Sequence, residues 1–244
     1  MSKPTITLIG PGAIGAALAA GLIEAGHDPT LVTRTAFDRL CVDWPAGSVD
    51  VAVDCVTDAA QVEPADVVIV ATKATQNEAV SDHVRAAVRP DSMLLIAQNG
   101  VDHCDRFDVA ARVVPAIVML PSERHGPGRA TVGSPSRLVI PADAAGAEVA
   151  AIFEGSFIDV ETSDDWTSAA WLKLMMNAAV GGIGVLARRG SDVFHDGGAL
   201  ELLGALMEEV AAVGRAEGAV LAADLPSQLQ RYQAANAGGH TTSI

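Results

Sequence analysis

Basic side chains are scarce in this sequence. Lysine and arginine together number 16 against 30 aspartates and glutamates, which gives a formal net charge of -14 at pH 7. This balance excludes a nucleic-acid groove and a basic membrane-surface helix, because both need clustered positive charge. It also makes each lysine or arginine that lies where an anion could bind a candidate for a specific role.

Cysteine is rarer still, and metal-binding spacings are missing. The three cysteines, Cys41, Cys55 and Cys104, are odd in number and have no CxxC spacing. Because the chain also lacks a recognisable signal peptide, we expect reduced thiols in a cytoplasmic protein. The six histidines fall into no HExxH or similar pattern, so no metal site is predicted.

Long hydrophobic runs are absent, with one exception at residues 166–187. This segment contains one charged residue, Lys173, and one amide, Asn177, a helical turn apart. It is long enough to span a membrane. However, a lysine at the centre of a span costs about 2.5–3.5 kcal/mol on insertion scales, and several glycines follow it. We therefore expect a buried helix and no membrane span.

What the chain does contain is typical of a globular α/β protein. Its 244 residues are 50% hydrophobic and 19% charged, enough for the core of one large domain or two smaller ones. In the first half, apolar β-branched runs alternate with helix-like segments, which predicts βαβ units and a doubly wound parallel sheet. The expected elements are strands at 4–10, 29–34, 65–73 and 92–100 and helices at 13–26 and 75–88.

The pattern changes twice further along the chain. Residues 112–140 consist of short strand-like pieces broken by proline and glycine, followed by a helix near 143–153 and a strand near 156–161. After Ser163 no strand signal remains, so the sequence predicts an N-terminal α/β domain over 1–163 and a C-terminal all-helical domain over 164–244. The helices of the second domain are expected at 164–189, 197–217 and 225–236.

The turn after the first predicted strand has the spacing of a dinucleotide-binding site. The stretch GPGAIG places Gly10, Gly12 and Gly15 in G-x-G-x-x-G order between a strand and a helix. The glycines would allow a tight turn, backbone approach to a pyrophosphate and close packing of helix on strand. The helix N-terminus would offer N–H donors to the phosphates. The alternative is a glycine-rich turn without a ligand.

The end of the second predicted strand distinguishes between the two nicotinamide cofactors. NAD sites place an acidic residue here for the ribose hydroxyls, whereas this chain has Arg34. A guanidinium suits a 2′-phosphate, to which it can donate charge-assisted hydrogen bonds. NADP(H) is thus the expected cofactor, and the alternative for Arg34 is a solvated residue at a strand end.

Two further polar residues follow predicted strands, at the edge of the sheet where such folds bind ligands. Lys73 ends the stretch VVIVATK, and Asn99 lies at the end of LLIAQNG. Both are candidate ligand contacts. The alternatives are a surface lysine and a turn-forming asparagine before glycine.

Taken in order, GPGAIG, Arg34, ATKATQ, AQNG and KLMMN resemble the ketopantoate reductase (2-dehydropantoate 2-reductase) family over essentially the whole chain. The resemblance implies an NADP-binding Rossmann domain, a helical substrate and dimerisation domain, and an active site in the cleft between them. It also implies reduction of a small 2-oxo acid by NADPH, which becomes NADP+. The closest reaction is 2-dehydropantoate to pantoate, as in pantothenate biosynthesis, and the resemblance leaves a homodimer open.

The resemblance further implies a role for each matching residue. Arg34 and Lys73 would lie on the adenosine-phosphate side, and Asn99 near the nicotinamide and the substrate. Lys173 matches the family's proton-donating lysine and Asn177 its substrate-binding asparagine. Ser243 matches the serine that hydrogen-bonds the substrate, and the turn that would bind the cofactor, with the pyrophosphate on its glycines, consists of Gly10, Pro11, Gly12, Ala13, Ile14 and Gly15.

Lys173 also suits the role of proton donor on chemical grounds. Reduction of a ketone needs a proton for the developing alkoxide, and an ammonium desolvated by apolar neighbours such as Trp171 and Leu172 should have a lowered pKa. It would also stabilise the negative charge on the oxygen as it forms. Asn177 projects from the same helical face and could hold a substrate hydroxyl or carboxylate. The alternatives are a snorkelling lysine and an asparagine that makes a capping or interhelical contact.

The segment that follows Asn177 is rich in glycine. Gly181, Gly182 and Gly184 each cost a helix up to about 1 kcal/mol relative to alanine. Their presence predicts either a kink or a close approach by another backbone or a ligand, and the sequence leaves both open.

The chain departs from the family pattern at three places. Gly181 stands where a second asparagine is usual, and Ser191 stands where a further substrate-side asparagine is usual. The chain ends at Ile244, before the segment in which family members carry a supporting acidic residue, so it is either naturally short or truncated. These departures leave two alternatives open, a paralogue acting on another oxo acid and a non-catalytic NADP(H)-binding sensor.

Overall fold

The computed structural model describes residues 3–237. The chain divides into two compact units at Asp164 and Asp165. Unit 1 comprises residues 1–164 and unit 2 residues 165–244, and each is described by itself. Ser243 lies outside the described residues.

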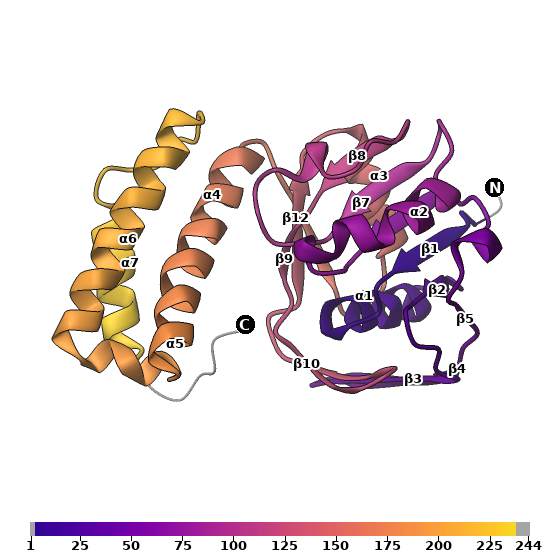
Figure 1. Cartoon of the computed structure of the whole chain (residues 1–244), viewed down its shortest axis with the longest axis horizontal. Coiled ribbons are helices and arrows are strands. Elements are labelled where there is room, and N and C mark those ends of the chain that lie inside the picture. Colours follow the sequence, from indigo (N-terminus) through magenta and orange to yellow (C-terminus); the bar gives the residue numbers. More distant parts are fainter. Residues whose placement is uncertain (1–2, 238–244) are drawn as a thin grey trace. The chain divides into compact units, whose positions relative to one another are not determined.

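Unit 1 is built around a six-stranded sheet, sheet A, in which every neighbouring pair of strands is parallel (Figure 1). The strand order is β5-β2-β1-β6-β7-β8, so the chain moves outward in one direction from β1 and then returns to build in the other. This order is that of a Rossmann-like doubly wound sheet, as predicted. The strands are β1 Ile6–Ile9, β2 Thr30–Val32, β5 Cys55–Val56, β6 Val67–Val70, β7 Met93–Ile96 and β8 Arg112–Pro115.

The continuous apolar runs of sheet A arise because both of its faces are buried. On one face, Leu8, Ile69 and Leu95 join a core that includes helix α1 (Ala13–Glu24). On the other face, Ile9 and its neighbours on β6 and β7 pack in a second core with helix α2 (Asn77–Ala87). Successive residues of one strand therefore enter opposite cores, which removes the apolar–polar alternation of a half-exposed strand.

A second sheet covers the other side of α1, which lies between the two sheets (Figure 1). This four-stranded sheet B has the order β10-β11-β3-β4, with strands β3 Arg39–Trp44, β4 Gly47–Ala52, β10 Ser122–Gly126 and β11 Arg129–Val132. The β3–β4 hairpin was not predicted. Its inward residues, such as Leu40 and Val42, alternate with exposed Arg39 and Asp43, so no long apolar run marks it.

A third, smaller sheet completes unit 1. It has the order β13-β12-β9 and consists of β9 Ile117–Met119, β12 Arg137–Pro141 and β13 Asp159–Ser163. Helix α3 (Ala144–Ile152) packs on β12 and β13, and Asp143 caps its N-terminus by accepting a hydrogen bond from the Gly146 N–H at 2.8 Å. Short 3-10 turns occur at Ala59–Gln61 (η1), Ala74–Gln76 (η2) and His103–Asp105 (η3).

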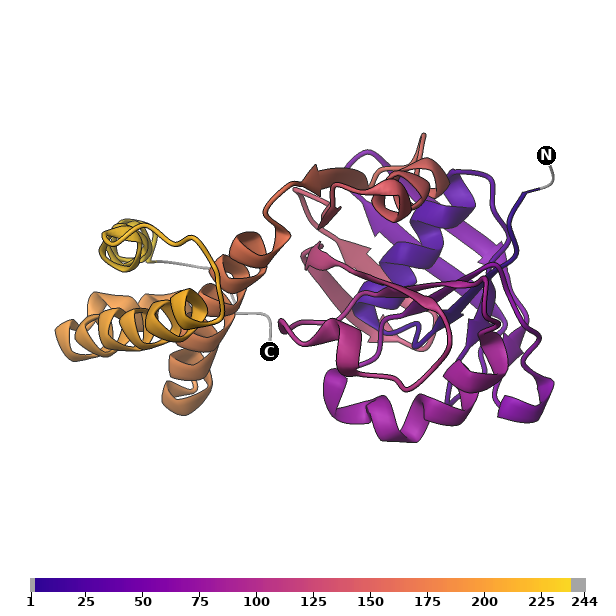
Figure 2. The ribbon, with the colours of Figure 1, turned by 90° about the horizontal axis from the view of Figure 1, so that it is seen from above.

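Within its described residues, 165–237, unit 2 contains helices joined by turns and loops and no strand. Helix α4 packs along α6, and α7 packs on α6, as both views show (Figures 1 and 2). The helices are α4 Trp166–Met176, α5 Gly182–Ala187, α6 Gly197–Ala216 and α7 Leu225–Ala235, with a 3-10 turn η5 at Ser191–His195.

The predicted helix at 164–189 is interrupted at the glycine-rich segment, where the sequence predicted a kink or a close approach. Between α4 and α5 the chain forms a π-helical turn, η4, over Asn177–Gly181. Such wide turns insert one residue into a helix and are frequent at functional sites. The physical reason lies in the glycines at its C-terminal end, which weaken the preference for a regular α-helical turn.

The run Trp166–Ala187 is, among the described residues, the one helical stretch long and apolar enough to cross a membrane by length and composition alone. Of its most apolar 18-residue window, 28% is buried. The expected buried helix is thus buried along one side, through Trp171 and Met175, while Leu186 is 83% exposed.

Candidate active site

The glycine-rich turn after β1 is held by backbone hydrogen bonds. The Gly10 N–H donates to the Val32 carbonyl at 2.9 Å, and the Gly12 N–H donates to the Gly10 carbonyl at 2.7 Å. Gly10 has a φ of +89°, a conformation that favours glycine. A Cβ at Gly10 would also lie 3.0 Å from the Thr72 backbone N, so the turn passes directly against the chain that follows β6.

Gly15 lies where α1 packs closely against the end of β1, and this close packing leaves no room for a side chain. A Cβ at this position would overlap the Gly10 carbonyl oxygen and lie 2.9 Å from the carbonyl carbon. The protein's own packing therefore accounts for Gly10 and Gly15, which keep the N-terminus of α1 tight against β1 and β6.

Gly12 differs from the other two glycines. No atom of the described chain lies within 4 Å of a Cβ at Gly12, so packing within the protein does not require glycine. Gly12 is also the N-cap of α1 and has no side-chain cap, which leaves first-turn N–H groups available to a ligand. A helix N-terminus without a side-chain cap, at a residue that has no side chain of its own, can accommodate a pyrophosphate. Pro11 in the same turn is buried, and Ala13 and Ile14 are half-buried.

Arg34 lies two residues beyond the end of β2. Its side chain is exposed and makes no hydrogen bond or ion pair within residues 3–237. The preceding residue fixes the backbone, because the Thr33 N–H donates to the Val56 carbonyl at 2.9 Å and its hydroxyl donates to the Thr35 carbonyl at 3.2 Å. The guanidinium is therefore carried on an ordered strand end and is available to an anion.

The chain segments after β1, β6 and β7 leave sheet A at the same edge. In the sheet register, Ile9 pairs with Val70 and Val70 pairs with Ile96. Parallel strands bring their carboxyl ends together, so this edge carries the glycine turn, Lys73 and Asn99. Both Lys73 and Asn99 are exposed, and the structure brings these predicted residues to one side of unit 1.

A polar network beneath this edge was missed by the sequence reasoning, which considered Asn99 but not its neighbour. The Gln98 side chain is buried and donates to the Thr72 hydroxyl at 3.0 Å and to Asn77 Oδ1 at 2.8 Å. Arg106 donates to Gln98 Oε1 at 2.9 Å. A glutamine at the end of an apolar strand was the available signal, since buried amides need specific partners.

Lys173 lies on α4 in unit 2 and is half-buried. Burial lowers the pKa of its ammonium, because removal from water disfavours the charged form. The ammonium makes no hydrogen bond or ion pair with another described residue, so nothing offsets this effect. The direction agrees with what a proton donor near neutral pH requires.

Asn177 begins the π-helical turn one turn after Lys173, and its backbone N–H donates to the Lys173 carbonyl. A Cβ at Gly181 or Gly182 would meet no atom of the described chain within 4 Å. The sequence left a kink and a close approach open; the chain forms a π-helical turn here, and no atom of the described chain comes close at either glycine. Ser191 is buried at the start of η5.

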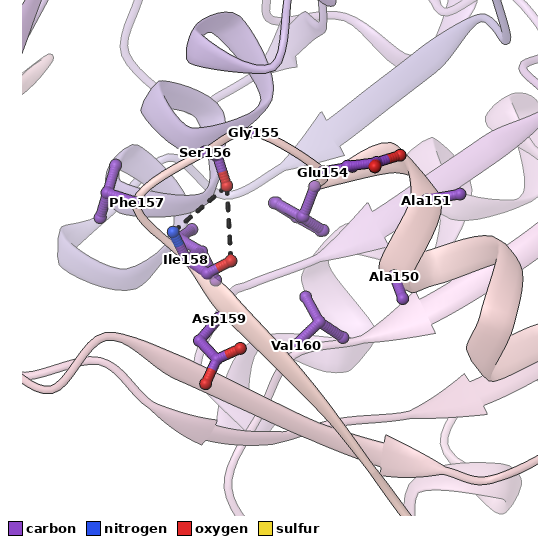
Figure 3. Close-up of a pocket in the computed structure, with 10 residues that line it drawn as sticks. Ala150, Ala151, Glu154, Gly155, Ser156, Phe157, Ile158, Asp159 and Val160 are labelled. Carbon is purple, nitrogen blue, oxygen red and sulfur yellow. Dashed lines mark hydrogen bonds between the residues drawn. The ribbon is translucent and has the colours of Figure 1, made fainter.

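A separate hollow in unit 1, with a volume of about 490 Å³, contains none of the predicted site residues. It is lined by residues 150–151 and 153–160, at the end of α3 and the start of β13 (Figure 3). Ser156 turns back on its own loop, accepting from the Ile158 N–H at 3.2 Å and donating to the Ile158 carbonyl at 3.5 Å. Among the described residues, no group of three or more histidine, cysteine or acidic side chains could hold a metal ion.

The sequence matches two family models, which together cover most of the chain. Residues 6–144 match the model described as "Ketopantoate reductase PanE/ApbA", and residues 165–244 match "Ketopantoate reductase PanE/ApbA C terminal". The chain is 37% identical over 239 residues to a 2-dehydropantoate 2-reductase of Caulobacter vibrioides, covering 96% of this chain and 82% of that protein.

Solved structures give the same picture. A PanE/ApbA family ketopantoate reductase from Ralstonia eutropha JMP134 superposes with a TM-score of 0.88 and is 28% identical, over 98% of this chain and 83% of that chain. A dimeric ketopantoate reductase from Staphylococcus aureus superposes with a TM-score of 0.81 and is 25% identical, over 94% of this chain and 79% of that chain.

Proposed function

The chain belongs to the ketopantoate reductase family, and we propose that it catalyses the NADPH-dependent reduction of a small 2-oxo acid, with 2-dehydropantoate as the first candidate. The products are the 2-hydroxy acid, here pantoate, and NADP+. The observation that carries the proposal is the carboxyl edge of sheet A, where the open backbone at Gly12 lies beside an uncapped helix N-terminus. The named reaction of the relatives supports the choice of substrate.

The choice of NADPH over NADH rests on Arg34. Its guanidinium is exposed, has no partner within residues 3–237, and follows β2 where NAD-specific sites carry an acid. We assign Arg34 and Lys73 to the adenosine-phosphate end of the cofactor and the segment from Gly10 to Gly15 to its pyrophosphate. When bound, NADPH supplies the hydride that the carbonyl carbon accepts.

Lys173 supplies the proton in this proposal. As the carbonyl oxygen gains negative charge, the ammonium stabilises it and gives up a proton, which yields the hydroxyl group. The support is chemical: the ammonium is half-buried, has no described partner, and has a lowered pKa because of that burial. Asn99, Asn177 and Ser243 are assigned to substrate binding.

The pH dependence of turnover follows from this role. The protonated form of Lys173 is the active one, so kcat should fall as the pH rises through the Lys173 pKa. Since burial lowers that pKa, the fall should begin at a lower pH than for an ordinary lysine. A pH–rate profile at saturating substrate checks this, and an alkaline limb that persists unchanged in Lys173→Ala would contradict the assignment.

The reaction is tested by following NADPH absorbance with a panel of 2-oxo acids that includes 2-dehydropantoate. We expect turnover of at least one, and 2-dehydropantoate at the highest kcat/KM. Tight NADPH binding with turnover of none would refute the reductase and favour a non-catalytic NADP(H) sensor.

A paralogue that reduces another oxo acid is the second candidate. Gly181 favours it, because its missing side chain leaves open space beside the π-helical turn. The outcome that selects it is a higher kcat/KM with a different member of the same panel.

The proposed setting is that of a biosynthetic enzyme. We propose that it acts in the cytoplasm, in pantothenate synthesis, on a small-molecule substrate and without nucleic-acid or membrane partners. The Staphylococcus aureus structure is described as dimeric, and we propose a homodimer for this chain. Light scattering of the purified protein tests the assembly.

A further inference from the structure

The loop after β7 contains a buried arginine that the proposed reaction does not use. The Arg106 side chain is 5% exposed, whereas its ion-pair partner Asp102 is 72% exposed. Burying a guanidinium is costly unless its donors are satisfied, so a buried arginine is retained where its geometry matters.

The hydrogen bonds of the Arg106 side chain all go to the short segment 98–102. Nη2 donates to the Asn99 carbonyl at 2.7 Å and to Asp102 Oδ1 at 2.6 Å. Nε donates to the same carboxylate oxygen at 3.2 Å, and Nη1 donates to Gln98 Oε1 at 2.9 Å. The planar guanidinium thus connects the Asn99 backbone carbonyl, at the start of the turn, to the Asp102 carboxylate at its end.

The turn itself is shaped around this guanidinium. Gly100 has a φ of +122°, and a Cβ there would overlap Arg106 Nη2 and lie 3.0 Å from Asp102 Oδ1. His103 Nε2 lies 2.7 Å from the Gln98 carbonyl and forms a further hydrogen bond to the same strand end. The path of residues 98–100 is therefore set by contacts with Arg106 and its neighbours.

Gln98 carries the effect of Arg106 to a second loop. Because Arg106 donates to Gln98 Oε1, the amide nitrogen must face the opposite way, where it donates to Thr72 Oγ1 at 3.0 Å and Asn77 Oδ1 at 2.8 Å. Thr72 precedes Lys73, and Asn77 begins α2. One buried chain of hydrogen bonds thus connects the loops that carry Asn99 and Lys73.

We propose that Arg106 is a positioning residue for the reductase. Through the Asn99 carbonyl and the Gln98 amide, it fixes the loops after β6 and β7 so that the Asn99 side chain is presented at the carboxyl edge of sheet A. This inference rests on the proposed function, which assigns Asn99 to substrate binding. Arg106 is given no contact with the substrate in this proposal and acts through the backbone that carries Asn99.

The test compares Arg106→Lys with the wild-type protein. Lysine keeps the positive charge but lacks the planar set of donors, so it cannot hold the Asn99 carbonyl and Gln98 together. We expect kcat/KM for the oxo acid to fall by about tenfold or more, since a small misplacement of a positioning group is costly. NADPH affinity, measured by fluorescence titration, should fall by a smaller factor than kcat/KM does, because Lys73 lies on an affected loop whereas Gly12 and Arg34 do not depend on Arg106.

Two further variants distinguish positioning from general stability. Arg112→Lys removes the paired donors of an arginine that bonds both oxygens of Glu148, on β8 and away from these loops, and should leave kcat and KM unchanged. Gln98→Glu removes the donors to Thr72 and Asn77 but keeps an acceptor for Arg106, so it should reproduce the loss in kcat/KM. In the double variant with Arg106→Lys and Gln98→Glu, the loss in kcat/KM should be smaller than the two single losses combined, because both changes break the same connection.

Hydrogen exchange provides a readout that needs no turnover. In Arg106→Lys, peptides covering residues 71–77 should exchange faster together with those covering 97–101, because the two loops are coupled. Unchanged exchange at 71–77 overturns the proposal whether or not the protein is active. Unchanged kcat/KM in Arg106→Lys, when the wild-type enzyme is active, overturns it as well. If the wild-type protein has no turnover, the proposed reductase function is refuted, and hydrogen exchange alone then tests the coupling of the two loops.

Discussion

The two units bury their apolar side chains to different extents. Both extended hydrophobic cores of the described chain consist entirely of unit 1 residues. The large hydrophobic side chains that stay exposed within residues 3–237 all belong to unit 2, namely Leu172, Val185, Leu186, Leu202, Val213, Val220 and Tyr232. Unit 1 thus encloses its large apolar side chains, whereas unit 2 leaves several of its own exposed.

The units also differ in how they prepare candidate site residues. In unit 1 the backbone places the candidate residues, because the glycine-rich turn and the ends of neighbouring strands lie at the same edge of sheet A. In unit 2 the candidate residue is one partly desolvated side chain, Lys173, on a helix that continues into the π-helical turn at Asn177. We propose that unit 1 binds the cofactor and that unit 2 supplies the proton, and the following variants test that division.

Replacing Lys173 should have the largest effect. In Lys173→Ala, kcat should fall by about 10²–10⁴-fold, the range typical of a lost general acid, while NADPH affinity stays nearly unchanged. Steady-state kinetics and a fluorescence titration measure the two quantities. Lys3→Ala, a change at an exposed lysine of unit 1, is the matched control. Wild-type activity in Lys173→Ala would rule out proton donation by unit 2.

Substitutions at two glycines of the same turn should separate binding from stability. Gly12→Val should weaken NADPH binding by about tenfold or more with little change in Tm, because its side chain meets only space that a pyrophosphate would need. Gly15→Ala should instead lower the free energy of unfolding by about 1–3 kcal/mol, since its Cβ would overlap the Gly10 carbonyl. Identical behaviour of the two variants would contradict the pyrophosphate assignment.

Loss of the guanidinium at Arg34 should affect one cofactor only. Arg34→Ala should weaken NADPH binding by about tenfold, as expected for a charge-assisted hydrogen bond, and scarcely affect NADH. The ratio of the two dissociation constants is the measurement. If both cofactors lose affinity equally, Arg34 does not bind the 2′-phosphate.

The exposed surface of unit 2 should give the smallest change in stability. Leu186→Gln should alter the free energy of unfolding by no more than about 0.5 kcal/mol, because the side chain is 83% exposed, and should reduce self-association in light scattering. Leu203→Ala, at a fully buried position of α6, is the contrasting control and should cost about 2–5 kcal/mol. Unaltered self-association in Leu186→Gln would show that this part of unit 2 stays in contact with solvent.

The sequence predicts sheet A well because strands buried on both faces are continuous apolar runs, as at Val67–Val70 and Met93–Ile96. It does not reveal the β3–β4 hairpin, in which buried Leu40 and Val42 are separated by exposed or half-exposed residues. The G-x-G-x-x-G spacing pointed to Gly12, the end of the second predicted strand to Arg34, and the family resemblance to Lys173, and their roles stay predictions.

Two features could not be found from the sequence for physical reasons. The Gln98–Arg106 network depends on which way the Gln98 amide faces, and its nitrogen meets Thr72 and Asn77, more than twenty residues earlier in the chain, while its oxygen meets Arg106. The π-helical turn depends on a shift of one residue in the hydrogen-bond register, to which the spacing of apolar residues is insensitive. Glycines near Asn177 indicated an irregularity but not its form.

The pairing of β3 with β11 has a consequence for the folding of unit 1 during synthesis. These parallel strands align Cys41 with Arg129, so sheet B cannot be completed until the ribosome has released residues close to 132. Contacts between such distant segments slow folding, because a long loop must close before they form. Until then, the β3–β4 hairpin has an unpaired strand edge and α1 lacks its cover, which makes the nascent chain most prone to aggregation at this stage.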